Sequence, residues 1–153
     1  MTTDRTLIDV VELGFEGWNT RDYDKIASRV TDDYVFETDA VAQPLRGREA
    51  FLGFVRAFLT AFPDLHFDLT DVVAADNRVV ACWTATGTHL GEFRGLAPSR
   101  RRVRVQGVTV THFRDGRIAS QRAFWDSASL MRQLAGEGGD GGLEEGGSTD
   151  DSP

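Results

Sequence analysis

One stretch, residues 103–126, constrains the fold more than any other part of this 153-residue chain. Its sequence, VRVQGVTVTHFRDGRIASQRAFWD, is rich in β-branched and aromatic residues on both sides of Asp115-Gly116. A D-G pair between two strand-like runs predicts a β-hairpin, and turns of two or three residues are both compatible with it. At about 3.4 Å per residue, the ribbon would extend on the order of 30 Å. A ribbon of that length can bend and wall a pocket.

The rest of the chain is arranged around this hairpin. Apolar residues spaced three and four apart predict helices, and alternating apolar residues predict strands. The helices are expected at 5–19, 22–30, 48–62 and 127–135. The strands are expected at 34–38, 65–74, 78–89 and the two arms of the hairpin. Helices gathered on the N-terminal side of a mostly antiparallel sheet indicate an α+β fold. We expect the sheet to curve into a cone, with the three N-terminal-side helices on its concave face.

Composition separates one domain, residues 1–135, from a tail. Residues 136–153 are rich in Gly, Glu, Asp and Ser, which predicts a disordered acidic segment. This tail holds six of the 24 acidic residues and no base, so it accounts for most of the net charge of −7. The domain itself is nearly neutral and shows no field that would select a polymeric partner. No apolar run has the length of a membrane span or a signal peptide, and we expect a cytoplasmic protein without membrane contact.

Other residue types exclude several classes of site. Cys82 is the single cysteine and is expected to be a reduced, packed thiol. The three consecutive arginines at 100–102 lack interleaved aromatic residues, so we predict a solvated loop and no nucleic-acid partner. The three histidines show no metal-ligand spacing, and we expect no metal and no cofactor.

Four stretches carry a resemblance to a known family. They are FEGWNTRDYDKI near the start, FPDLHF at 62–67, GTHLGEFRGLAPSRRRV at 87–103 and FRDGRIASQRAFWDSASLMRQL at 113–134. In order and spacing they resemble the SnoaL-like polyketide cyclases, within the nuclear transport factor 2-like and ketosteroid isomerase-like superfamily. The resemblance covers nearly all of residues 5–135 and implies the cone fold, a small-molecule pocket and a dimer.

The family's catalytic residues are not retained. In its characterised anthracycline cyclases, the resemblance implies an aspartate base on the last strand, a histidine and a glutamine on the preceding strand, and an asparagine on the first. Anchored on Asp115-Gly116 and Trp125-Asp126, these positions fall on Ala123, Thr109, Gly107 and Phe36, respectively. The resemblance therefore implies the pocket without that particular aldol chemistry.

Two other residues are candidate proton carriers. Asp126 ends a strand rich in aromatic residues, and a carboxylate in an apolar pocket would suit a general base. Its simpler interpretation is the N-cap of helix 127–135. His89 ends a strand and begins a Gly-rich loop, where ligands are often bound. The alternative for His89 is a turn histidine hydrogen-bonded to its own loop.

The expected pocket is walled by aromatic residues, which could stack on a planar ligand or could equally be plain core. The expected ligand contacts are Trp18, Phe36, Phe54, Phe58, Trp83, Thr109 and Trp125. One hypothesis is a cofactor-free cyclase or isomerase acting by acid–base chemistry on a small, largely apolar cyclic or polyketide-like substrate. The alternative is a small-molecule binding protein, or a dimeric scaffold, without catalysis.

The outward face of the hairpin indicates how the protein assembles. Val108, Val110 and Phe124 are apolar residues on the face that the helices do not cover. An antiparallel sheet with one solvated face should place polar residues there. We therefore expect a homodimer, formed by pairing this face with its copy.

Overall fold

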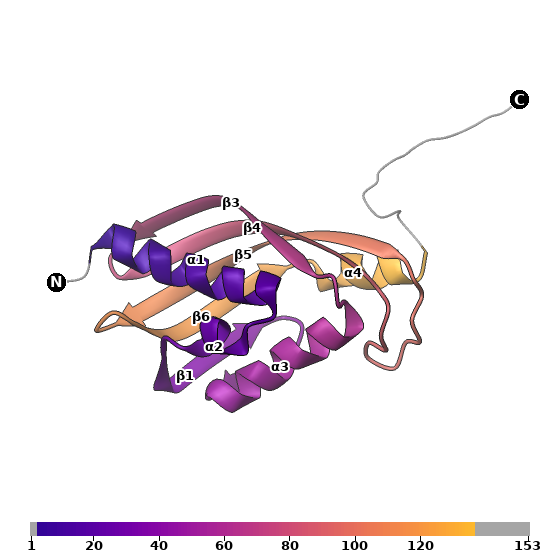
Figure 1. Cartoon of the computed structure of the whole chain (residues 1–153), viewed down its shortest axis with the longest axis horizontal. Helices are drawn as coiled ribbons and strands as arrows, with labels where there is room; N and C mark the ends of the chain where they lie inside the picture. The colour runs from indigo at the N-terminus through magenta and orange to yellow at the C-terminus, as the bar shows by residue number, and fades with distance from the viewer. Residues whose placement is uncertain (1–2, 137–153) are drawn as a thin grey trace, which may run out of the picture.

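The computed structural model describes residues 3–136 of the chain, and Figure 1 shows their arrangement. The helices are α1 (Asp4–Thr20), α2 (Tyr23–Ala27), α3 (Arg48–Ala61) and α4 (Ser127–Leu134). The strands are β1 (Val30–Thr38), β2 (Leu45–Arg46), β3 (His66–Ala75), β4 (Arg78–Thr88), β5 (Arg102–Arg114) and β6 (Arg117–Trp125). The tail predicted to be disordered lies outside the described residues, apart from its first residue, Gly136.

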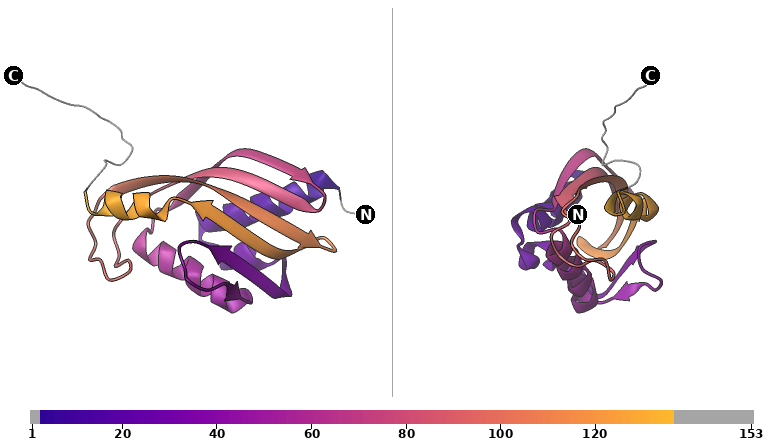
Figure 2. Two further views of the ribbon diagram at one scale, coloured as in Figure 1. Left: turned by 180° about the vertical axis from the view of Figure 1, so that it is seen from behind. Right: turned by 90° about the vertical axis from the view of Figure 1, so that its right-hand side faces the viewer.

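A single curved sheet forms the frame of the molecule. Its strand order is β2-β1-β6-β5-β4-β3, and only the β1–β6 pair is parallel within the described residues. Seen end-on, the sheet curls and α1, α2 and α3 complete the ring on its concave side (Figure 2). This arrangement confirms the predicted α+β cone.

The long hairpin at the centre of the prediction is present as β5 and β6. Asp115 and Gly116 have φ angles of 54° and 79°, and Arg114 pairs with Arg117 across the turn. Two positive φ angles are what a two-residue type I′ turn requires, which settles the turn length that the sequence left open. Asp76 and Asn77 turn β3 into β4 in the same way, with φ angles of 54° and 60°.

The prediction for residues 22–33 was wrong in part. Asp22 caps α2, as expected, with its side chain accepting a hydrogen bond from the Lys25 backbone N–H at 3.2 Å. The helix ends at Ala27, and Val30 already belongs to β1. Val30 lies opposite Ile118 of β6, so pairing with a strand far along the chain overrides the local helical pattern. The predicted loop before Gly47 also contains the two-residue strand β2.

The end of α1 is fastened to the sheet. The Asn19 side chain accepts a hydrogen bond from the Phe67 backbone N–H at 2.8 Å and donates one to the Phe67 carbonyl at 2.9 Å. Through these two bonds the Asn19 side chain satisfies the Phe67 backbone groups, as an adjacent strand would. They also fix Trp18, the preceding residue, beside the concave face. No helix among residues 3–136 combines the length and apolarity needed to cross a membrane.

Candidate functional site

A cavity lies between the concave face of the sheet and the helices. The volume in which the centre of a water molecule can move is about 110 Å³. That is several times the roughly 10–15 Å³ that one water requires on the same measure. Its lining comes from all four helices, from strands β1, β3, β4, β5 and β6, and from the segment between α3 and β3. Most of these side chains are apolar, and the aromatic ones are Phe15, Trp18, Phe36, Phe51, Phe54, Phe58, Phe62, Phe67, Trp83 and Trp125.

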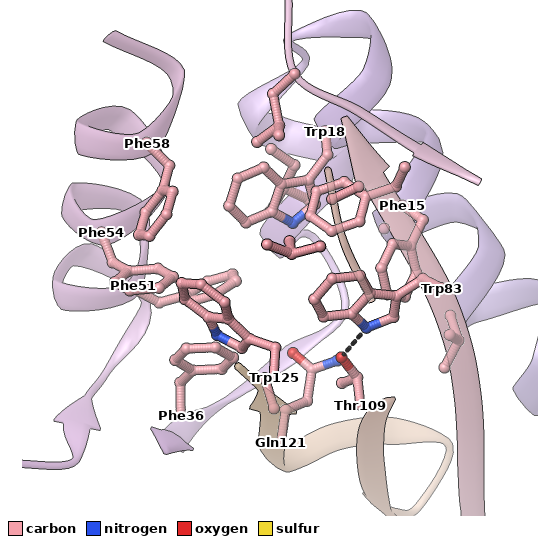
Figure 3. Close-up of a pocket in the computed structure, with 18 of the residues that line it drawn as sticks. Phe15, Trp18, Phe36, Phe51, Phe54, Phe58, Trp83, Thr109, Gln121 and Trp125 are labelled. Atoms are coloured by element: carbon pink, nitrogen blue, oxygen red, sulfur yellow. Dashed lines mark hydrogen bonds between the residues drawn. The ribbon is translucent and has the colours of Figure 1, made fainter. Parts of the chain in front are cut away.

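The aromatic side chains form two banks that face each other across the cavity (Figure 3). In one bank the Phe67 ring packs edge-on against both Trp18 and Trp83, with ring centres 5.2 and 5.1 Å apart. In the other, Phe58 contacts Phe54 at 4.9 Å and the indole of Trp125 at 6.0 Å. Such offset and edge-to-face contacts hold each ring in place. The banks therefore present two fixed apolar surfaces to the space between them.

The polar side chains of the cavity lining, and the buried polar groups that they bond to behind it, are gathered on the strands. The Trp83 indole N–H donates to the Thr109 hydroxyl at 2.9 Å. The Tyr34 hydroxyl donates to the Gln121 amide oxygen at 2.6 Å, and the Gln121 amide nitrogen donates to the Thr111 hydroxyl at 2.9 Å. Tyr34 is fully buried, and burial raises the pKa of its phenol well above 10.0. The phenol is therefore a neutral hydrogen-bond donor at physiological pH.

All seven residues expected to contact a ligand line this cavity. They come from α1, α3 and four different strands, and folding brings them together around one cavity. Contact with a ligand stays a prediction for each of them. Gln121 was missed, although alternation along β6 from Ala123 and Trp125 places it on the same inward face.

Asp126 does not line the cavity. Its side chain is 63% exposed and accepts a hydrogen bond from the Ser129 backbone N–H at 2.9 Å. Arg132, one turn later in α4, approaches the same carboxylate at 3.8 Å. The N-cap interpretation is confirmed, and the proton-carrier role stays a prediction that this position does not favour.

His89 is fully buried beside the cavity and is not part of its lining. Its Nδ1 accepts a hydrogen bond from the Ser99 backbone N–H at 3.0 Å and lies 2.9 Å from the Ser99 hydroxyl. Nε2 has no hydrogen-bond partner among the described residues, and the ring packs 5.6 Å from Phe62. The histidine thus holds its own loop, as the alternative interpretation expected, and its proton-carrier role stays a prediction.

The positions that the family resemblance marks as catalytic do lie at this cavity. Thr109, Ala123 and Phe36 line it, and Thr109 pairs with Ala123 across β5 and β6. Gly107 has no side chain, and the Trp83 ring occupies the space where one would begin. No ionisable side chain of residues 3–136 lines the cavity. Residues 3–136 also contain no group of three His, Cys, Asp or Glu side chains that could hold a metal ion.

Comparison with known proteins gives a consistent result. The family model described as SnoaL-like polyketide cyclase matches residues 8–134. The aklanonic acid methyl ester cyclase AcmA of Streptomyces galilaeus is 28% identical over 128 residues, which are 83% of this chain and 89% of AcmA.

Two solved structures share the whole fold. A protein from Jannaschia sp. CCS1 assigned to the SnoaL-like polyketide cyclases superposes with a TM-score of 0.82 at 25% identity, over 88% of this chain and 95% of that one. IdmH from Streptomyces antibioticus, assigned as a polyketide cyclase, superposes with a TM-score of 0.74 at 26% identity, over 84% of this chain and 98% of IdmH. The chain therefore belongs to the SnoaL-like polyketide cyclase family.

Proposed function

We propose that the cavity binds a small, largely apolar, cyclic or polyketide-like compound and promotes its ring closure or isomerisation by positioning. The observation that supports this most directly is the lining: two facing banks of aromatic rings with a small set of hydrogen-bonding groups between them. Concave apolar sites with a few placed polar groups are the usual form of small-molecule sites. The similarity to AcmA, a cyclase by name, supports the same class of ligand.

The kind of catalysis follows from what the lining contains. Thr109 and Gln121 are hydrogen-bonding groups that keep their charge state across the physiological pH range. Such groups can stabilise charge that develops on a substrate oxygen, while the aromatic banks hold the chain of the substrate in a ring-closing conformation. Proton transfer by Asp126 or His89 would require the substrate to reach residues outside the lining.

A second function is favoured by one specific observation. The cavity lining has no carboxylate or imidazole within the described residues, so a pocket that binds a compound and releases it unchanged is the competing proposal. Both proposals expect binding in the same place. They differ only in whether the bound compound is recovered as itself or as a product.

The experiment uses the full chain and a panel of polycyclic aromatic ketones and linear aromatic polyketones. Thermal shift identifies the compounds that bind, and chromatography with mass spectrometry after incubation identifies conversion. Trp125→Ala opens the cavity wall, whereas Phe124→Ala changes the adjacent residue of β6, which is 43% exposed on the opposite face. We expect Trp125→Ala to lose the thermal shift and Phe124→Ala to keep it. No shift with any compound in the unmutated protein would contradict both proposals.

A further inference from the structure

Two polar side chains of the cavity lining each keep an unused hydrogen-bond donor after their internal hydrogen bonds are counted. The Thr109 hydroxyl accepts from Trp83, and its own hydrogen has no acceptor among residues 3–136. Gln121 accepts from Tyr34 and gives one amide hydrogen to Thr111, which leaves its second amide hydrogen without an acceptor in the same residues. The oxygens of Thr109 and Gln121 each accept one hydrogen bond and keep a second lone pair, and both residues also keep one spare donor.

The sheet register places these two donors together. Thr109 lies opposite Ala123, and Thr111 lies opposite Gln121, so the four residues form one square on the concave face. Figure 3 shows the Thr109 and Gln121 side chains next to each other at the base of the cavity, between the two aromatic banks. Ala123 is the smallest member of the square that lines the cavity, so its position leaves room for a ligand atom above the sheet.

Trp83 fixes the direction of the Thr109 donor. Its indole crosses the strand over Gly107, where any side chain would overlap the indole ring. The indole N–H then approaches one lone pair of the Thr109 oxygen. A hydroxyl that accepts from one side must point its own hydrogen elsewhere, and Thr109 is 6% exposed and borders the cavity. A buried donor without an acceptor is costly, so a bound molecule that supplies one would be favoured.

We propose that Thr109 and Gln121 form a two-donor site for a single carbonyl oxygen of the ligand, seated above Ala123. The inference rests on the proposed function and adds the ligand's chemistry: a flat, apolar ring system that carries a ketone oxygen on one edge. Thr109 and Gln121 are binding residues that hold that oxygen by direct hydrogen bonds. An apolar ring without the oxygen fits the same banks and leaves both donors unsatisfied.

Fluorene and 9-fluorenone test this directly, because they share one flat tricyclic shape and differ by a methylene against a carbonyl. Quenching of tryptophan fluorescence gives both dissociation constants, since all three tryptophans of the chain line the cavity. The ratio of the two constants is compared in the unmutated protein, in Thr109→Val, which keeps the shape without the hydroxyl, and in Thr109→Ser, which keeps the hydroxyl. Comparing ratios cancels the different hydrophobicities of the compounds.

The preference for fluorenone is expected to fall in Thr109→Val by on the order of two- to tenfold, as the loss of one net hydrogen bond implies. Thr109→Ser should retain the preference. Equal ratios in all three proteins would overturn the two-donor site and leave the proposed function standing. Failure of both compounds to bind the unmutated protein would contradict the proposed function as well.

A second measurement keeps the inference testable if Thr109→Val folds poorly. The infrared carbonyl band of fluorenone bound to the unmutated protein should lie below its position in an apolar solvent, because hydrogen bonding weakens the C=O bond. A band at the apolar-solvent position would overturn the two-donor site whatever the variants do.

Discussion

Asp126 and His89 are two residues whose surroundings suit structural roles better than the proton-transfer roles considered from the sequence. Asp126 is exposed and caps a helix, whereas His89 is buried and hydrogen-bonded to Ser99 of its own loop. Both are polar groups that satisfy nearby backbone N–H groups, which is the ordinary task of such residues at chain reversals. The residues at the cavity are instead uncharged.

Substitution of Asp126 separates its cap from any role in catalysis. Asp126→Ala should lower the free energy of unfolding by about 1 kcal/mol, because the Ser129 N–H loses its acceptor. Asp126→Asn keeps a good capping residue and should stay close to the unmutated protein in urea unfolding. If Asp126→Asn keeps this stability but abolishes conversion of an identified substrate, the carboxylate is a proton carrier after all.

We expect the stability of the fold to depend on pH through Asp64. Its carboxylate accepts hydrogen bonds from the backbone N–H and the hydroxyl of Thr88, both at 2.7 Å. Partial burial raises the pKa of the Asp64 carboxyl, but the bonds from Thr88, a backbone hydrogen bond at Asp64 and the charge of Arg102 together leave the pKa below its ordinary value of 3.8. A pKa lowered in the folded state adds stability above pH 3.8 that is lost as pH falls through the folded value.

The matched variant for this effect is Asp64→Asn, which has nearly the same shape and no titration. The unmutated protein should be more stable than Asp64→Asn at pH 7 in urea unfolding. That difference should shrink as the pH falls below about 4. A difference that stays constant from pH 7 to pH 3 would show that ionisation of Asp64 contributes nothing to stability.

At the scale of single elements, the cavity depends on how β4 lies against β5. Trp83 of β4 lies opposite Gly107 of β5 in the sheet register, and its ring crosses the glycine. A Cβ atom at position 107 would overlap that ring and lie 2.8 Å from the carbonyl oxygen of Phe124. The bulky indole and the missing side chain are therefore a matched pair that shapes one wall of the cavity.

Gly107→Ala should lower the free energy of unfolding by about 1–3 kcal/mol, the usual cost of overfilling a packed site. Adding Trp83→Phe should recover part of that loss, because the smaller ring can withdraw while the Phe124 carbonyl cannot. Urea unfolding of both single variants and the double variant measures the coupling between the two positions. Strictly additive effects would show that the two side chains do not compete for the same space.

At the scale of the whole molecule, the outward face of the sheet carries a row of apolar residues. Cys82, Val108 and Phe124 lie in register across β4, β5 and β6, and Val110 lies on the same face of β5. Phe124 is 43% exposed. We propose that this face pairs with its copy about a two-fold axis, since contiguous exposed apolar surface marks interaction sites.

Val110→Asp places a charge in the proposed contact and should give monomers or insoluble protein. Val110→Thr keeps the branched shape without a charge and should remain dimeric. Light scattering at micromolar concentration distinguishes these states. A mass of one chain for the unmutated protein would rule out the dimer.

Local sequence patterns by themselves determined most of the elements and the kind of fold. Asp115-Gly116 and Asp76-Asn77 specify tight turns through their tolerance of positive φ, and the apolar spacing of 48–62 specifies a helix that the structure ends at Ala61. Alternation along the strands identified the inward aromatic residues. These features are local, because backbone preference and side-chain period act over a few residues.

Tertiary structure alone decided the chemistry of the cavity. Whether Val30 continued a helix or began β1 depended on Ile118, a residue 88 positions away in the chain. The side chains of Asp126 and His89 could have turned toward the cavity or toward nearby backbone groups, and only the packed loops fixed the second outcome. The spare donors of Thr109 and Gln121 likewise follow from which partners the fold brings to them. Hydrogen-bond partners far apart in sequence are set by packing, which no local pattern encodes.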